Sequence, residues 1–158
     1  MNVLLMIVVI LAVWRGWRGM KRGMVDEVGR LLSLVISLFV ISLGILLYTS
    51  VKENDTKNIV LSIVMIIITG LTARLVNFVM KSLSTIAHLP VINILNGLLG
   101  IGVGIAEVVV ALWIVYVIIA SFDTGSFGLR MMTWTKQSEI LEKLYQMNQF
   151  AYWMAAGL

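Results

Sequence analysis

Long stretches without a charged residue constrain this chain more than any other feature. Residues 1–14, 31–51, 58–73, 82–106 and 108–122 contain no Asp, Glu, Lys or Arg. Hydrophobic residues form 60% of the chain and charged residues 13%, against roughly 45–50% and about 25% in soluble domains. A water-soluble fold of this size would expose large apolar patches. The chain is therefore predicted to fold in a lipid bilayer.

Four membrane-spanning helices account for these runs, because a span needs about 20 mostly apolar residues. Residues 31–51 reach that length without a charge, and another run does so if Glu107 is tolerated inside the membrane. We expect the first run to be a retained helix, not a signal peptide, because its basic residues follow the apolar stretch. The predicted transmembrane unit covers residues 1–122, with spans at about 2–20, 26–51, 58–80 and 92–122.

Basic residues predict the orientation of these spans. The connectors after the first and third spans, with the adjoining helix ends, hold Arg15, Arg18, Lys21, Arg22, Arg30, Arg74 and Lys81. The opposite side holds Lys52, Lys57, Arg130, Lys136 and Lys143, diluted by Glu53, Asp55, Asp123, Glu139 and Glu142. Basic residues collect in cytoplasmic connectors, so both termini are predicted to lie outside the cytoplasm.

The last part of the chain, residues 123–158, has a different composition. Residues 123–128 are predicted to form a loop, and residues 138–154 an amphipathic helix. Aromatic residues of this segment are of the kind enriched at membrane interfaces. We expect a helix that lies on the outer surface or docks on the bundle or on a partner. Its apolar face is predicted to comprise Ile140, Leu141, Leu144, Met147, Ala151 and Met154.

Small residues follow one flank of the fourth span. At 100° per residue, Gly97, Gly100, Gly104 and Ala111 cluster on this flank, which we call the glycine seam. Small residues at such spacing allow another helix backbone to approach closely. The favoured interpretation is a contact inside the bundle, and the alternative is a contact between two copies of the chain.

Glu107 lies on the same flank, near the middle of the fourth span. An acid at that depth costs a few kcal/mol unless it is neutralised or paired. It is either a functional proton or ion group or a structural acid, and either role requires a partner. The arginines are predicted to lie about two turns too shallow to pair with it. The alternative partners are Ser33, Ser37, Thr69, Thr72 and Asn77.

A basic hairpin is predicted between the first two spans, comprising Arg15, Arg18, Lys21, Arg22, Gly23 and Glu27. Its glycines allow either a close helix contact or a sharp turn. Its basic residues are predicted to contact anionic lipid headgroups, at about 1 kcal/mol per charge near the surface.

Residues that would support catalysis or a cofactor are sparse. The chain has no cysteine and only one histidine, His88, whereas a metal site needs several ligands. Neither a nucleophile elbow, a Walker loop nor a dinucleotide fingerprint occurs, and no basic patch is large enough for nucleic acid. We therefore predict a protein that is not an enzyme and has no cofactor, metal or nucleic-acid partner.

Several short sequence patterns follow one another in an order and spacing that resemble those of a known family. They are Asn2 before the first apolar run, residues 19–24 with Glu27, Leu89 and Pro90, Asn96, Leu99 and Gly100 with Gly104, and the segment 138–148. In these patterns the chain resembles the CvpA family, the colicin V production proteins. Asn96 and Gly100 match the Asn–Gly pair of that family, and Lys21, Arg22, Gly23 and Glu27 match its basic-glycine turn.

The resemblance implies a small inner-membrane protein with four spans, linked to colicin V production or export and to envelope integrity. Our leading hypothesis is an all-α, non-enzymatic protein that acts through helix packing and through membrane or envelope partners, as a monomer or a homo-oligomer. The alternative is a small channel or transporter subunit that uses Glu107 as an intramembrane proton or ion group. No role of Glu107 is implied by the resemblance.

Overall fold

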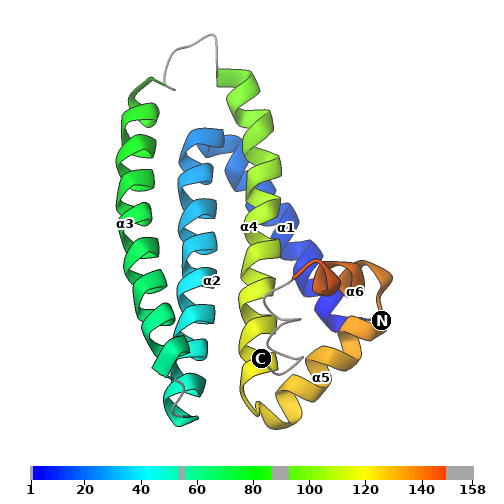
Figure 1. Ribbon diagram of the computed structural model, residues 1–158. Helices are drawn as coiled ribbons and strands as arrows, with labels where there is room; N and C mark the ends of the chain where they lie inside the picture. Colours follow the sequence, from blue (N-terminus) through cyan, green and yellow to red (C-terminus); the bar gives the residue numbers. More distant parts are fainter. Residues whose placement is uncertain (1, 54–55, 87–92, 149–158) are drawn as a thin grey trace.

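The fold was analysed in a computed structural model, which describes residues 2–53, 56–86 and 93–148. Every regular element within these ranges is a helix (Figure 1). The long helices are α1 (Val3–Arg22), α2 (Met24–Lys52), α3 (Thr56–Ile86) and α4 (Asn93–Ser121). Two shorter ones follow, α5 (Gly125–Lys136) and α6 (Glu139–Gln146).

The four long helices are each long and apolar enough to cross a membrane. This confirms the predicted all-α fold class with four transmembrane helices. The helices extend beyond several of the predicted spans, most clearly at α3, which continues to Ile86. A helix can continue past the hydrocarbon layer because its backbone hydrogen bonds remain within the helix.

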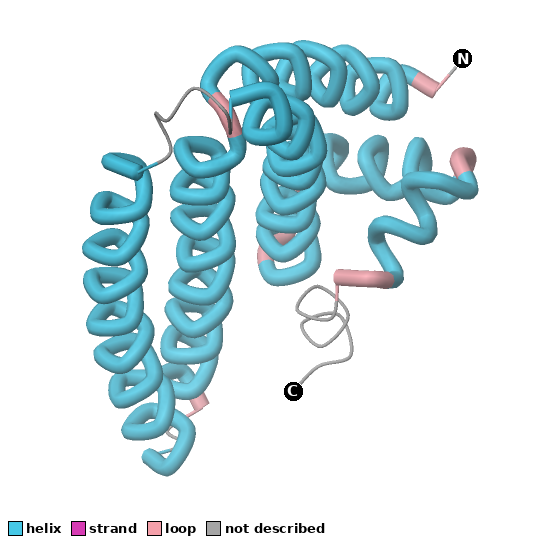
Figure 2. Tube along the Cα trace, turned by 90° about the horizontal axis from the view of Figure 1, so that it is seen from above, coloured by secondary structure: helices cyan, strands magenta, loops and turns pink. Residues whose placement is uncertain are grey.

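The long helices pack in the spatial order α3, α2, α4, α1. Extensive contacts join α3 to α2, α2 to α4 and α4 to α1. Figures 1 and 2 both show α1 running at an angle to the other three, so that its first turns lie beside α5 and α6. The chain thus leaves α4, turns back, and covers the start of α1.

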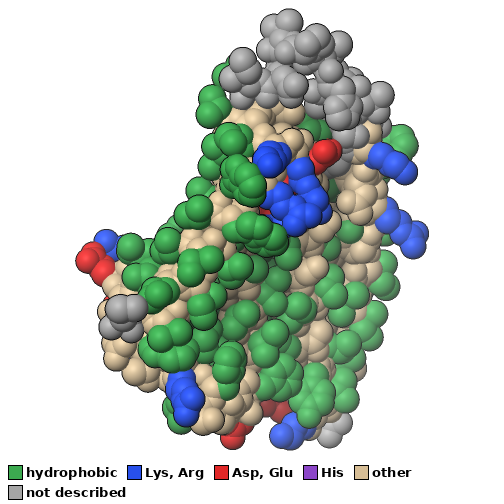
Figure 3. Space-filling view, turned by 180° about the vertical axis from the view of Figure 1, so that it is seen from behind, with side chains coloured by type: hydrophobic (Ala, Val, Ile, Leu, Met, Phe, Trp, Pro, Cys, Tyr) green, Lys and Arg blue, Asp and Glu red, His purple; other side chains and the backbone are tan. Residues whose placement is uncertain are grey.

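The buried core lies where α1, α2 and α4 meet the C-terminal helices. Its buried members are Leu4, Leu38, Ile45, Leu112, Tyr116, Val117, Met131 and Leu141. The outer faces, by contrast, are apolar and exposed, as in Leu75 and Phe78 of α3, which are 67% and 72% exposed. Figure 3 shows hydrophobic side chains over most of one face, with charged side chains in its upper part, at its lower end and at one side edge. Such a surface is suited to lipid and not to water.

The region after α4 differs from its predicted organisation. Residues 123–128 were expected to form a loop, but α5 begins at Gly125. The predicted helix over 138–154 begins as expected, because Ser138 caps α6 by accepting a hydrogen bond from the backbone N–H of Leu141 (3.5 Å). The helix α6 ends at Gln146, and Ala151 and Met154 lie outside the described residues.

Candidate functional site

Glycines of α1 and α4 bring the two backbones into direct contact. A Cβ atom on Gly19 would lie 2.1 Å from the carbonyl oxygen of Gly100, and one on Gly100 would lie 2.3 Å from that of Gly19. A turn further along, a Cβ on Gly104 would lie 2.5 Å from the carbonyl oxygen of Arg15. No side chain fits at these distances, so van der Waals contact between backbones holds the pair together.

The other members of the glycine seam lie at its two ends. A Cβ on Gly97 would lie 3.0 Å from the carbonyl oxygen of Met20. Ala111 lies beyond the contact and lines a cavity between the helices. The partner face on α1 includes Gly16, whose added Cβ would lie 3.2 Å from Ile101. The seam therefore contacts α1 of the same chain.

Arg15 and Glu107 form an ion pair inside the helical unit. Nη2 of Arg15 donates to Oε2 of Glu107. The Glu107 side chain is 1% exposed and that of Arg15 is 20% exposed. The pair joins α1 to α4 and supplies the partner that an intramembrane acid requires.

This pairing corrects the prediction that the arginines lie too shallow. The seam places Arg15 opposite Gly104, only three residues or about 4.5 Å along α4 from Glu107. Side chains lean towards the N-terminus of their own helix, so in antiparallel helices Arg15 and Glu107 lean towards each other. Counting residues from the end of each span estimates the depth of a side chain in the membrane. It does not give the register between two helices or the direction in which their side chains lean.

The hydroxyl groups proposed as alternative partners bond within their own helices. Ser37 donates to the carbonyl oxygen of Ser33 (2.8 Å), and Thr69 and Thr72 donate to carbonyl oxygens four residues earlier in α3 (2.7 and 2.9 Å). Back-bonding of this kind is how helical Ser and Thr are satisfied without a partner helix. The Asn77 side chain is exposed.

A second buried acid lies near the ion pair. Glu27, in the first turn of α2, is 1% exposed and interacts electrostatically with Arg15. Among the described residues, neither of its carboxylate oxygens has a hydrogen-bond partner, and Oε1 of Glu107 has none either. The sequence places Glu27 in the basic hairpin but does not reveal its burial, because burial depends on contacts between helices and not on the local sequence.

Gly23 forms the sharp turn between α1 and α2. Its φ is +88°, a value that favours glycine, and a Cβ there would lie 2.3 Å from Nδ2 of Asn96. Oδ1 of Asn96 accepts a hydrogen bond from the backbone N–H of Val25 (3.3 Å). Asn96 therefore acts from α4 as a cap for the start of α2, which needs acceptors for its first N–H groups.

The basic residues of the hairpin lie against tryptophans of the same helix. The Arg18 guanidinium lies 5.5 Å from the ring centroid of Trp14, and the Lys21 ammonium lies 3.9 Å from that of Trp17. These are cation–π distances. Arg22 is partly exposed at the last turn of α1.

Polar contacts attach α5 and α6 to the membrane-spanning helices. The Tyr116 hydroxyl shares a hydrogen bond with that of Thr135 (2.8 Å), and Nε1 of Trp113 donates to the carbonyl oxygen of Leu144 (2.8 Å). Nδ2 of Asn2, which also caps α1, donates to the carbonyl oxygen of Trp134.

The apolar face predicted for the last helix is only partly buried. Leu141 is fully buried, whereas Ile140 and Met147 are exposed. The segment thus docks on the bundle, one of the three expected arrangements.

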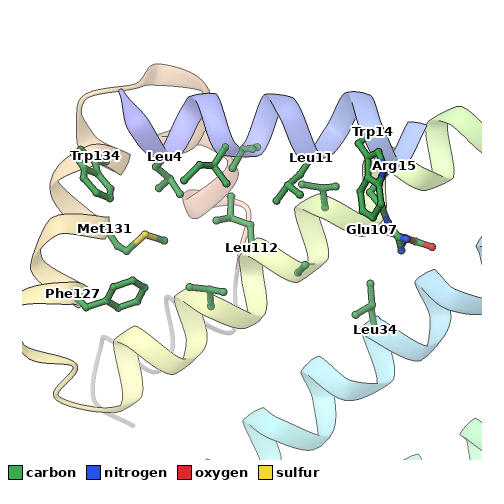
Figure 4. Close-up of a pocket in the computed structure, with 15 residues that line it drawn as sticks. Leu4, Leu11, Trp14, Arg15, Leu34, Glu107, Leu112, Phe127, Met131 and Trp134 are labelled. Atoms are coloured by element: carbon green, nitrogen blue, oxygen red, sulfur yellow. The ribbon is translucent and has the colours of Figure 1, made fainter. Parts of the chain in front are cut away.

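A cavity of about 580 Å³ lies between α1, α4 and α5. Figure 4 shows Trp14, Arg15 and Glu107 at one end and Phe127, Met131 and Trp134 at the other. Its walls are apolar except at the ion pair. We call this space the α1/α4/α5 cavity.

The described residues contain no cluster of three potential metal ligands among His, Asp and Glu. His88 lies outside the described ranges. Comparison with known families gives one match: the family model described as colicin V production protein matches residues 3–149. A search of curated proteins and a search of solved structures found no match.

Proposed function

The chain belongs to the colicin V production protein family, and on that premise we propose that it acts without enzymatic activity, in toxin export and envelope maintenance. In this proposal it works in the inner membrane as a scaffold. Its helices present a docked outer segment to membrane or envelope partners.

One observation supports a scaffold above all: buried and partly buried polar side chains connect helices to one another. Glu107 binds Arg15 of another helix, Asn96 caps the start of α2, and Tyr116 bonds to Thr135 of α5. Each bond fixes the position of two elements. A rigid arrangement of this kind suits a protein that presents a surface.

The proposed partner surface is the outer face of α5 and α6. Leu129 of α5 and Ile140 of α6 are 73% and 60% exposed. Because α5 and α6 are docked on the bundle by their opposite faces, these apolar side chains are available to a partner protein or to the lipid interface.

Colicin V secretion tests this surface in producing cells that lack the chromosomal copy of this protein. The parent chain should restore secretion, and Leu129→Asp or Ile140→Asp should not. Thr133→Asp, on an exposed position of the same helix as Leu129, adds the same single negative charge; it is the charge-matched control and should restore secretion. Full secretion with both apolar replacements would contradict the proposed surface.

The proposed orientation places both termini outside the cytoplasm and the basic hairpin inside, in contact with anionic headgroups. Reporter fusions after Asp55 and Leu158 should be active on the outer side, and a fusion after His88 should be active in the cytoplasm. The reverse pattern would contradict the orientation.

A homo-oligomer would have to use a face other than the glycine seam, because the seam contacts α1 of the same chain. Crosslinking from exposed α3 positions tests for such an oligomer.

A transport role for Glu107 is the alternative proposal. It is favoured by one observation: three buried carboxylate oxygens, on Glu27 and Glu107, have no hydrogen-bond partner among the described residues. A proton or ion flux through liposomes containing the parent chain, lost in Glu107→Gln, would support transport. No flux with the parent would contradict it.

A further inference from the structure

The α1/α4/α5 cavity is apolar along its length and open to its surroundings. Lining residues Ile7, Leu11 and Phe127 are 48%, 42% and 58% exposed. The cavity extends along α1 from Leu4 to Trp14, ten residues or about 15 Å of helix. Its volume of about 580 Å³ lies within the usual range of ligand sites, roughly 300–1,000 Å³.

Basic residues lie around Trp14 at one end of this cavity. Trp14 lines the cavity, and the guanidinium groups of Arg15 and Arg18 lie 5.9 and 5.5 Å from its ring centroid. The charge of Arg15 is balanced by Glu107. Arg18 does not line the cavity itself, but its guanidinium lies against the ring of Trp14, which does. Lys21 and Arg22 follow along the same helix.

We propose that this cavity binds one acyl chain of an anionic phospholipid, whose phosphate lies at Arg18 and whose chain runs along α1 from Trp14 towards Leu4. A complementary ligand has an anionic end and a long apolar remainder, and the surrounding bilayer supplies that molecule. A zwitterionic lipid offers the same chain without the net charge that basic residues attract. The inference rests on the proposed placement of the basic hairpin among lipid headgroups.

Native mass spectrometry of the full chain in non-ionic detergent tests the site. The chain is incubated with equal amounts of phosphatidylglycerol and phosphatidylcholine of identical acyl chains, and the retained lipid is counted. We expect one retained phosphatidylglycerol, preferred about fivefold, which is the preference that one near-surface cation provides. Arg18→Gln should abolish the preference. Arg74→Gln, on an exposed position of α3, should leave it unchanged.

A second pair of variants tests the cavity itself. Ala111→Trp fills the space and should prevent retention, whereas Gly102→Trp, on the same helix but with open space around it, should retain the lipid. Equal retention of both lipids by the parent, or unchanged retention by Ala111→Trp, would overturn the proposal. Far-ultraviolet circular dichroism checks that the variants are folded. If Ala111→Trp does not fold, Arg18→Gln provides an independent test of the proposal. A chain that retains the lipid but fails to support secretion would overturn the proposed function alone.

Discussion

Individual buried polar residues determine how the helices of this protein are placed relative to one another. Arg15 and Glu107 join α1 to α4, and Asn96 joins α4 to the turn at Gly23. In an apolar environment each of these groups is costly without its partner. Replacing one partner of such a pair is therefore expected to lower the free energy of unfolding more than replacing both partners would suggest.

Arg15→Gln should destabilise the chain by about 3–5 kcal/mol, because it removes the ion-pair partner of the buried Glu107 carboxylate. Glu107→Gln should cost less, because Arg15 is 20% exposed and also interacts with Glu27. The double variant should be less destabilised than the two single changes added together. Free energies of unfolding in detergent micelles, combined in a double-mutant cycle, measure the coupling. The exposed pair Glu139–Lys143 (2.7 Å) is the control and should give less than about 0.5 kcal/mol. Strict additivity at Arg15 and Glu107 would contradict the predicted pair.

Gly23→Ala should destabilise the chain by about 2 kcal/mol. Part of this cost is the left-handed backbone conformation, about 1–2 kcal/mol for a residue with a Cβ, and part is displacement of the Asn96 side chain from its hydrogen bond. Gly29→Ala is the matched control. It has open space in α2 and should stabilise the helix by about 0.5–1 kcal/mol. Equal effects of the two substitutions, measured by unfolding in micelles, would contradict the role of Gly23.

Two kinds of contact hold the elements together. Backbone contact dominates between α1 and α4, whereas side chains and hydrogen bonds attach α5 and α6. The contact between α1 and α4 depends on the absence of side chains, whereas the docking of α5 and α6 depends on side chains that fit against the bundle. Substitutions that add atoms should disturb the seam, and substitutions that remove atoms should disturb the docked segment.

Gly100→Ala tests the seam, because its methyl group would lie 2.3 Å from a backbone oxygen of α1. A backbone atom cannot move aside without moving the helix, so we expect a loss of about 1–3 kcal/mol and a wider separation of α1 and α4. Spin labels on the outer ends of the two helices measure the separation. Gly102→Ala, where nothing lies within 4 Å, should leave it unchanged. An unchanged separation in Gly100→Ala would contradict the tight seam.

Leu141→Ala tests the docking of α6. Leu141 is 0% exposed and its neighbour Ile140 is 60% exposed, so Ile140→Ala is a control of nearly identical composition. Loss of a buried leucine should cost about 2–5 kcal/mol, and limited proteolysis should then cleave α5 and α6 while α1 to α4 remain protected. Equal cleavage of the two variants would show that α6 does not depend on its buried face.

At the scale of the whole molecule, the apolar runs sufficed to predict the four long helices, because length and hydropathy are local properties. The position of the glycine seam also followed from spacing within one helix. The partner of Glu107 did not, because it depends on the register between α1 and α4. Likewise, the glycines at 125 and 128 suggested a loop, but the burial of Met131 and Thr135 against the bundle outweighs their low helix propensity.

The separation of Arg15 and Glu107 in the chain has a consequence for biosynthesis. The two residues are 92 positions apart, so the arginine enters the bilayer long before its counter-charge has been translated. At about 5–20 residues per second, that delay is roughly 5–18 s. During this time Glu27 of α2 is the acid available to Arg15, and α1 can pack against α4 only after α4 has been made. Of the four long helices, α1 is therefore made first, yet it reaches its packed position only after α4 has been made.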